Sequence, residues 1–62
     1  MIDRIVKRAR EIDKNGRGLV AAFEDARHEV EAQEGRRLTR EEQWELGDRF
    51  EEVLDEKMGG KR

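Results

Sequence analysis

Apolar residues recur along this chain at intervals of three and four residues, the spacing of one face of an α-helix. In residues 2–14 the apolar positions are Ile2, Ile5, Val6, Ala9 and Ile12. In residues 19–33 they are Leu19, Ala22, Phe23, Ala26 and Val30. In residues 40–58 they are Leu46, Phe50, Val53 and Leu54. The pattern predicts three amphipathic helices over 2–14, 19–33 and 40–58.

The helix ends are marked by residues that favour helix termination and capping. Glycines, which commonly close helices, stand at positions 16, 18, 35, 59 and 60. Thr39 followed by Glu42 is a capping-box sequence, which predicts the start of the third helix. We expect the tail 59–62 to fray, because it has no apolar residue to hold it.

The length of the chain limits the fold to one small all-α domain over residues 1–62. About sixteen apolar residues lie in the three stripes, which is enough for a thin core and leaves little margin. Two packings satisfy the pattern. One is a three-helix bundle, and the other is a helical hairpin over 24–58 with the N-terminal helix docked on it.

The composition excludes most catalytic chemistry. The chain has no cysteine, serine or tyrosine to act as a nucleophile, and its only histidine is His28. One histidine without cysteine makes a zinc site implausible, and no apolar run is long enough to span a membrane. The sequence therefore predicts a non-enzymatic, cofactor-free, cytoplasmic protein that does not bind membranes.

Charge is distributed unevenly along the chain. Residues 1–18 carry six basic and three acidic side chains, whereas residues 39–62 carry five basic and eight acidic ones. The simplest interpretation is that the basic first helix neutralises the acidic third helix. The alternative is a contact face for nucleic acid or an acidic protein, formed by Arg4, Lys7, Arg8, Arg10 and Lys14. The net charge of −2 argues against nucleic acid.

Residues 13–24 resemble the twelve-residue calcium loop of an EF-hand. Asp13 stands at loop position 1, Asn15 at position 3, a glycine at position 6 and Glu24 at position 12. The resemblance implies calcium bound by the side chains of Asp13, Asn15 and Glu24 and the carbonyl of Leu19. Loop position 5 departs from the family because it is an arginine. The same residues also favour a plain turn between two helices.

Residues 34–42 resemble the helical hairpin near the start of many tailed-phage major capsid proteins. The resemblance rests on a glycine helix terminus at Gly35 followed by the Thr39–Glu42 capping box. It implies a hairpin between the second and third helices and a role in assembly.

Trp44 does not belong to the apolar stripe of the third helix. At about 100° per residue it lies roughly 160° from Leu46, on a face shared with Gly47, Glu51 and Met58. A glycine within a helix costs about 1 kcal/mol relative to alanine but allows another backbone to approach closely. Tryptophan is enriched at the centres of protein interfaces. We therefore predict an interaction surface formed by Trp44, Gly47, Glu51 and Met58.

Taken together, these patterns predict a small interaction or assembly module that binds another protein or a second copy of itself. A calcium-binding protein with one EF-hand-like loop is the first alternative. A nucleic-acid accessory protein that uses the basic first helix is the second.

Overall fold

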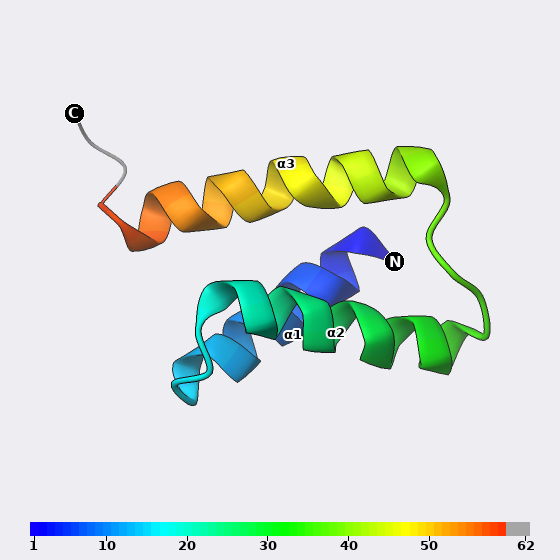
Figure 1. The fold of residues 1–62 in the computed structure, drawn as a ribbon, viewed down its shortest axis with the longest axis horizontal. Coiled ribbons are helices and arrows are strands. Elements are labelled where there is room, and N and C mark those ends of the chain that lie inside the picture. The colour runs from blue at the N-terminus through cyan, green and yellow to red at the C-terminus, as the bar shows by residue number, and fades with distance from the viewer. Residues whose placement is uncertain (60–62) are drawn as a thin grey trace.

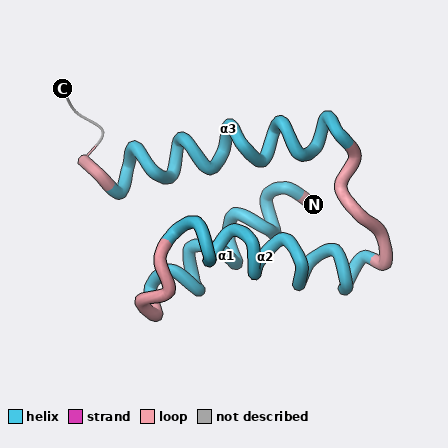
Figure 2. The backbone as a smooth tube through the Cα atoms, viewed as in Figure 1, coloured by secondary structure: helices cyan, strands magenta, loops and turns pink. Residues whose placement is uncertain are grey.

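The computed structural model describes residues 1–59 and contains three helices, with no strand among those residues (Figures 1 and 2). They are α1 (Ile2–Lys14), α2 (Leu19–Glu34) and α3 (Arg40–Lys57). The bounds predicted from the sequence differ from these by at most one residue. None of the three is both long enough and apolar enough to cross a membrane. Of the tail predicted to fray, residues 60–62 lie outside the described part of the chain.

Helices α1 and α2 form the closest pair in the fold. Ala9, Ala22 and Ala26 are fully buried, and their small side chains let the two helix backbones approach each other. The turn between the helices ends at Gly18, whose φ of 93° is one that other residues rarely adopt. Because this turn is short, α2 runs antiparallel to α1.

Helix α3 packs on α1 in the same direction as α1, so the chain forms an up-down-up three-helix bundle. Three ion pairs between these helices follow that direction: Arg49 with Asp3 at 3.0 Å, Arg10 with Glu56 at 2.8 Å and Lys57 with Asp13 at 2.8 Å. Of the two packings compatible with the sequence, the bundle is the one observed. The second and third helices are not a closely packed hairpin, since α2 and α3 have few direct contacts.

The core is formed mainly by α1 and α2. Its buried members are Ile2, Ile5, Ala9, Ile12, Leu19, Ala22, Phe23, Ala26, Val30, Leu38, Leu46 and Val53. Helix α3 contributes only two of these, Leu46 and Val53, while Phe50 and Leu54 are partly buried against the core. The side of α3 that faces α2 is therefore not closely packed against that helix.

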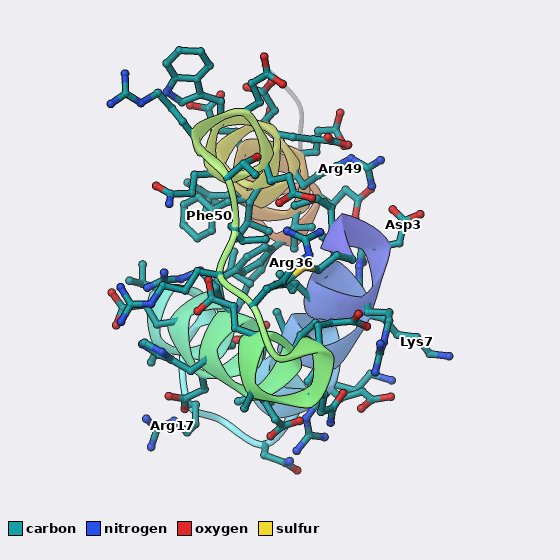
Figure 3. The ribbon with its side chains drawn as sticks, turned by 90° about the vertical axis from the view of Figure 1, so that its right-hand side faces the viewer. Asp3, Lys7, Arg17, Arg36, Arg49 and Phe50 are labelled. Carbon is teal, nitrogen blue, oxygen red and sulfur yellow. The ribbon has the colours of Figure 1, made fainter. Side chains whose placement is uncertain are left out.

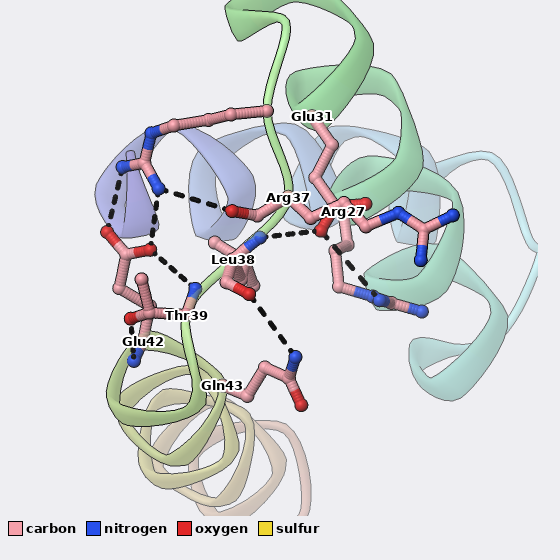
Figure 4. A network of polar contacts seen from close by, with 8 residues as sticks. Arg27, Glu31, Arg37, Leu38, Thr39, Glu42 and Gln43 are labelled. Atoms are coloured by element: carbon pink, nitrogen blue, oxygen red, sulfur yellow. Dashed lines mark hydrogen bonds and ion pairs between the residues drawn. The ribbon is translucent and has the colours of Figure 1, made fainter.

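The loop between α2 and α3 is held by a continuous set of polar contacts (Figure 4). The capping box is confirmed: the Glu42 amide donates to Thr39 Oγ1 at 3.2 Å, and the Thr39 amide donates to Glu42 Oε1 at 2.9 Å. Both terminal nitrogens of Arg36 donate to the Glu42 carboxylate at 2.9 Å. The Leu38 amide donates to Glu31 Oε2 on α2 at 2.9 Å. These contacts fix the direction in which α3 leaves the loop.

Gly35 allows the chain to turn at the end of α2. Its φ of 74° lies in the left-handed region, and its amide donates to the Glu31 carbonyl at 2.8 Å. The Arg36 amide donates to the same carbonyl at 3.2 Å. A side chain at position 35 would strain this helix end.

Acid is expected to destabilise the fold partly through Glu42. Its hydrogen bond from Arg36, and next that from the Thr39 amide, lower the pKa of this carboxyl from 4.5 to about 2. A carboxylate whose pKa is lower in the folded chain stabilises the fold above its unfolded pKa, and this contribution is lost as the pH falls toward the folded value. We expect Glu42→Gln to reduce the loss of thermal stability between pH 4.5 and pH 2.

Glutamine keeps the capping-box geometry, so this variant isolates the effect of charge. Arg36→Gln serves as the matched control, because it removes the main cause of the lowered pKa and should reduce the same loss. Parallel acid profiles for the wild type and both variants would contradict this account.

Candidate functional site

An open groove of about 460 Å³ runs between α2 and α3, where the two helices diverge. Helix α2 lines it with Val20, Phe23, Glu24 and Arg27, and helix α3 with Gln43, Leu46, Gly47 and Phe50. In Figure 3, Phe50 extends from α3 into the space above α2. The groove is a consequence of the fold, because α2 and α3 are each closer to α1 than to one another.

The floor of the groove is apolar and well packed. The rings of Phe23 and Phe50 meet edge to face, with centroids 5.1 Å apart and planes at 88°, which is a favourable aromatic geometry. Leu46 is buried beside them, whereas Val20 on the α2 wall is 63% exposed. The groove thus has a packed apolar base, and Val20 exposes an apolar side chain to solvent on the α2 wall.

The polar side chains of the groove lie on its rim. Arg27 is 3.9 Å from Glu31, at the limit of an ion pair. Gln43 donates weakly to the Leu38 carbonyl at 3.4 Å. Glu24 is exposed and forms no ion pair within residues 1–59. Of the two charged groups on the rim, only the carboxylate of Glu24 is therefore free to meet a partner.

The surface predicted from the sequence adjoins this groove. Trp44 is 68% exposed and Met58 is 76% exposed, and Gly47 and Glu51 are also exposed. Gly47 belongs to both features, since it lines the groove and shares a helix face with Trp44. A Cβ atom built at Gly47 would meet no atom within 4 Å, so the fold itself does not require glycine there.

The outer face of α3, opposite its buried residues, carries a surplus of carboxylates. None of these forms an ion pair within residues 1–59. We call Glu41, Asp48, Glu51, Glu52 and Asp55 the acidic face of α3. Glu41, Asp48 and Glu51 lie three, four and seven residues from Trp44 and so share its side of the helix.

The basic face predicted on α1 is largely paired within the molecule. Arg4 pairs with Glu34 on α2, and Arg8 pairs with Glu29 on α2 at 2.7 Å. Lys7 and Lys14 are exposed and form no ion pair within residues 1–59. The prediction that α1 neutralises α3 was mostly wrong, because Arg4 and Arg8 face α2. Only Arg10 reaches an α3 carboxylate, that of Glu56.

The proposed calcium ligands do not form one site, because each residue takes part in a different contact or element. Asp13 binds the Lys57 ammonium with both oxygens, at 2.8 and 2.9 Å. Asn15 is the C-cap residue of α1, Leu19 is buried at the start of α2, and Glu24 lines the groove. Within residues 1–59, no three His, Cys, Asp or Glu side chains are grouped so as to hold a metal ion. Calcium binding at this loop stays a prediction without support from the side-chain arrangement.

The sequence did not reveal the groove itself. The apolar pattern places Phe23, Leu46 and Phe50 in the core and predicts no role for Val20 and Gln43. One signal was present, since Val20 falls outside the apolar stripe of its helix just as Trp44 does. Val20 lines the groove, whereas Trp44 stands on α3 three residues before the lining residue Gly47.

No protein-family model, curated protein or solved structure matches the chain. The resemblances to an EF-hand loop and to a phage capsid hairpin therefore stay predictions. The fold and its surface define a small three-helix domain with an open, largely apolar groove between α2 and α3 and an acidic outer face on α3.

Replacing Gly47 by alanine is expected to stabilise the free chain by about 1 kcal/mol, because alanine favours the helix. The added methyl group meets no neighbouring atom within 4 Å. Urea denaturation of the wild type and the variant measures this difference. Gly35→Ala is the matched control and should destabilise the chain, since φ is 74° at that position. A loss of stability in Gly47→Ala would show that the glycine serves the fold.

Proposed function

We propose that this chain is a non-enzymatic protein-interaction or assembly module, and that it binds its partner in the groove between α2 and α3 and on the adjoining face of α3. The observation that carries this proposal is the apolar groove, which no part of residues 1–59 fills. Trp44 does not line the groove, but it is exposed on α3 three residues before Gly47, which does.

The size and composition of the groove suit a helix from a partner. Its apolar lining and its volume of about 460 Å³ can receive a few aliphatic side chains. Helix-in-groove recognition uses anchors spaced three and four residues apart, which an open apolar groove can receive. Filling the groove would remove the exposed Val20 and the half-buried Phe50 from water, and burial of apolar surface is the main favourable contribution to association.

The loop contacts support binding because they hold the groove in one shape. Arg36, Glu42 and Glu31 tie the start of α3 to the end of α2, and the ion pairs to α1 anchor the rest of α3. A surface that is already ordered loses less conformational entropy on binding.

Trp44 and Gly47 provide the features expected of an interface centre. Truncation of a buried tryptophan is often among the costliest changes at an interface. Gly47 leaves open space on the groove wall, so a partner helix can approach the α3 backbone there.

The test is selection from a displayed library of amphipathic helices about 18 residues long, roughly five helical turns. The residues beside the apolar stripe are randomised, and the selected helices are tested for binding to the wild type and to Gly47→Leu. Leucine at position 47 would occupy the groove while improving helix propensity, and circular dichroism verifies folding. Ala32→Leu adds the same side chain at an exposed position outside the groove.

We expect the selected helices to bind the wild type and Ala32→Leu equally and to lose binding to Gly47→Leu. Failure to select any helix, or equal binding to all three proteins, would reject the groove as the docking site.

A further inference from the structure

We infer that the helix docked in the groove comes from a different protein and carries an acidic side chain at the end nearest the α2–α3 loop, where Arg37 binds its carboxylate. This inference rests on the proposed function, and it specifies the chemistry of the partner. The observation behind it is a second hollow beside the groove, which we call the basic pocket.

The basic pocket adjoins the groove at the C-terminal part of α2. It has a volume of about 310 Å³ and is lined by Arg27, His28, Glu31, Arg37 and Gln43. Arg27 and Gln43 also line the groove, so the two hollows share part of their walls. A helix that lies along α2 in the groove would therefore reach the basic pocket with one of its ends.

The groove itself favours neither sign of charge in a partner. Its lining contains one carboxylate, that of Glu24, and one guanidinium, that of Arg27. The two residues are three positions apart on α2, and so they lie on the same side of that helix. The basic pocket removes this balance because it adds Arg37 beside Arg27.

Positive charge exceeds negative charge in the basic pocket. Two of its lining residues are arginines, which stay protonated in proteins, whereas Glu31 provides the one carboxylate that residues 1–59 contribute to it. This carboxylate is already engaged, since it accepts a hydrogen bond from the Leu38 amide at 2.9 Å and lies 3.9 Å from Arg27. Its side chain is also largely buried. Glu31 therefore leaves the charge of Arg37 uncompensated.

Arg37 is the cation available to a partner. It is exposed and forms no ion pair within residues 1–59. The neighbouring Arg36 binds the Glu42 carboxylate with both terminal nitrogens, and in Figure 4 the Arg37 side chain extends away from that carboxylate. A guanidinium presents its N–H groups in a planar fork that fits the two oxygens of a carboxylate.

The uncharged side chains of the basic pocket also favour a carboxylate. The Gln43 amide donates only weakly to the Leu38 carbonyl, at 3.4 Å, so it can donate to an incoming oxygen instead. His28 is exposed, and its neutral ring has one N–H donor. An ionised carboxylate accepts hydrogen bonds and donates none, whereas an amide would bring its own donors toward these groups.

A second copy of this chain does not provide such a helix. The apolar stripes of α1, α2 and α3 are buried or half-buried within the fold. The large apolar side chains that residues 1–59 leave exposed are Val20, Trp44 and Met58. Val20 is on another helix than Trp44, and Trp44 and Met58 lie near opposite ends of α3. They do not form the closely spaced stripe that the groove requires.

Three synthetic peptides test the inference. Each is an amphipathic helix with the same leucine stripe and blocked termini, and the residues beside the stripe in one terminal turn are glutamate, glutamine or lysine. Labelled peptides are titrated with the wild type, Arg37→Gln, Arg37→Glu and Gly47→Leu, and circular dichroism verifies that each variant folds. Lys14→Gln is the matched control, because it removes one exposed and unpaired positive charge outside the groove and the basic pocket.

We expect the wild type to bind the glutamate peptide about fivefold more tightly than the glutamine peptide, with the lysine peptide weakest. This ratio should fall to about one in Arg37→Gln and should be unchanged in Lys14→Gln. Arg37→Glu should prefer the lysine peptide. Because each ratio compares the same two peptides, differences in their own helicity cancel between the proteins. Higher salt should reduce the preference, since it screens exposed charges.

The outcomes separate this inference from the proposed function. Equal binding of the three peptides, lost in Gly47→Leu, would overturn the acidic anchor and leave the groove as a docking site. A glutamate preference that persists in Arg37→Gln would also overturn it. Absence of binding by all three peptides would count against both. Sedimentation of the free chain is a further check, since a dimer that Gly47→Leu dissociates would identify a second copy as the occupant and overturn the inference.

Discussion

Replacing Ile5 by alanine is expected to lower the free energy of unfolding by about 2–5 kcal/mol, the range for removing a large aliphatic side chain from a packed core. Ile5 is fully buried between α1 and the rest of the bundle. Domains of this size have a total stability of roughly 0.05–0.15 kcal/mol per residue. The substitution would therefore consume a large part of the stability of the chain.

Urea denaturation followed by far-ultraviolet circular dichroism measures the loss in Ile5→Ala. Val20→Ala is the control, because Val20 is an exposed β-branched residue on the groove wall, and its truncation should change stability by no more than about 0.5 kcal/mol. Equal effects of the two substitutions would mean that the core is not where the structure places it.

The second large effect is expected at Phe23, where alanine should cost about 3–5 kcal/mol. Phe23 is buried in the α1–α2 core, and its ring also packs edge to face on Phe50 of α3. The substitution removes core packing together with the aromatic contact that joins α2 to α3.

Phe50→Ala provides the comparison for this prediction. Phe50 is only partly buried, so its truncation should cost less than that of Phe23, with the α1–α2 pair left in place. Thermal melts and amide chemical shifts of both variants distinguish these results. A larger loss in Phe50→Ala than in Phe23→Ala would contradict the assignment of the main core to α1 and α2.

Local sequence signals were sufficient to predict the helices. Gly18, Gly35 and the Thr39–Glu42 capping box lie at helix ends and act through the conformation of a few neighbouring residues. Signals of this kind do not depend on how the helices later pack. The exposure of Trp44 could also be predicted, because its angular position on α3 depends only on helix geometry.

The groove could not be predicted in the same way, because it depends on distances between helices. The small buried side chains of Ala22 and Ala26 bring α1 close to α2, and nothing in the sequence of α3 indicates that α2 would remain farther away. The charge pattern was misleading for a related reason. Total charge per helix does not show which side each arginine faces, and Arg4 and Arg8 face α2.

The central claim is that a partner docks in the groove between α2 and α3 and on the adjoining face of α3 that carries Trp44. The most direct test is a titration of the isotopically labelled chain with a helix selected from the displayed library, followed through backbone amide shifts. We predict the largest shifts at Val20, Glu24, Trp44, Gly47 and Glu51, which lie on the groove and the adjoining face of α3. Shifts concentrated on the basic side of α1, around Lys7 and Lys14, would contradict this account.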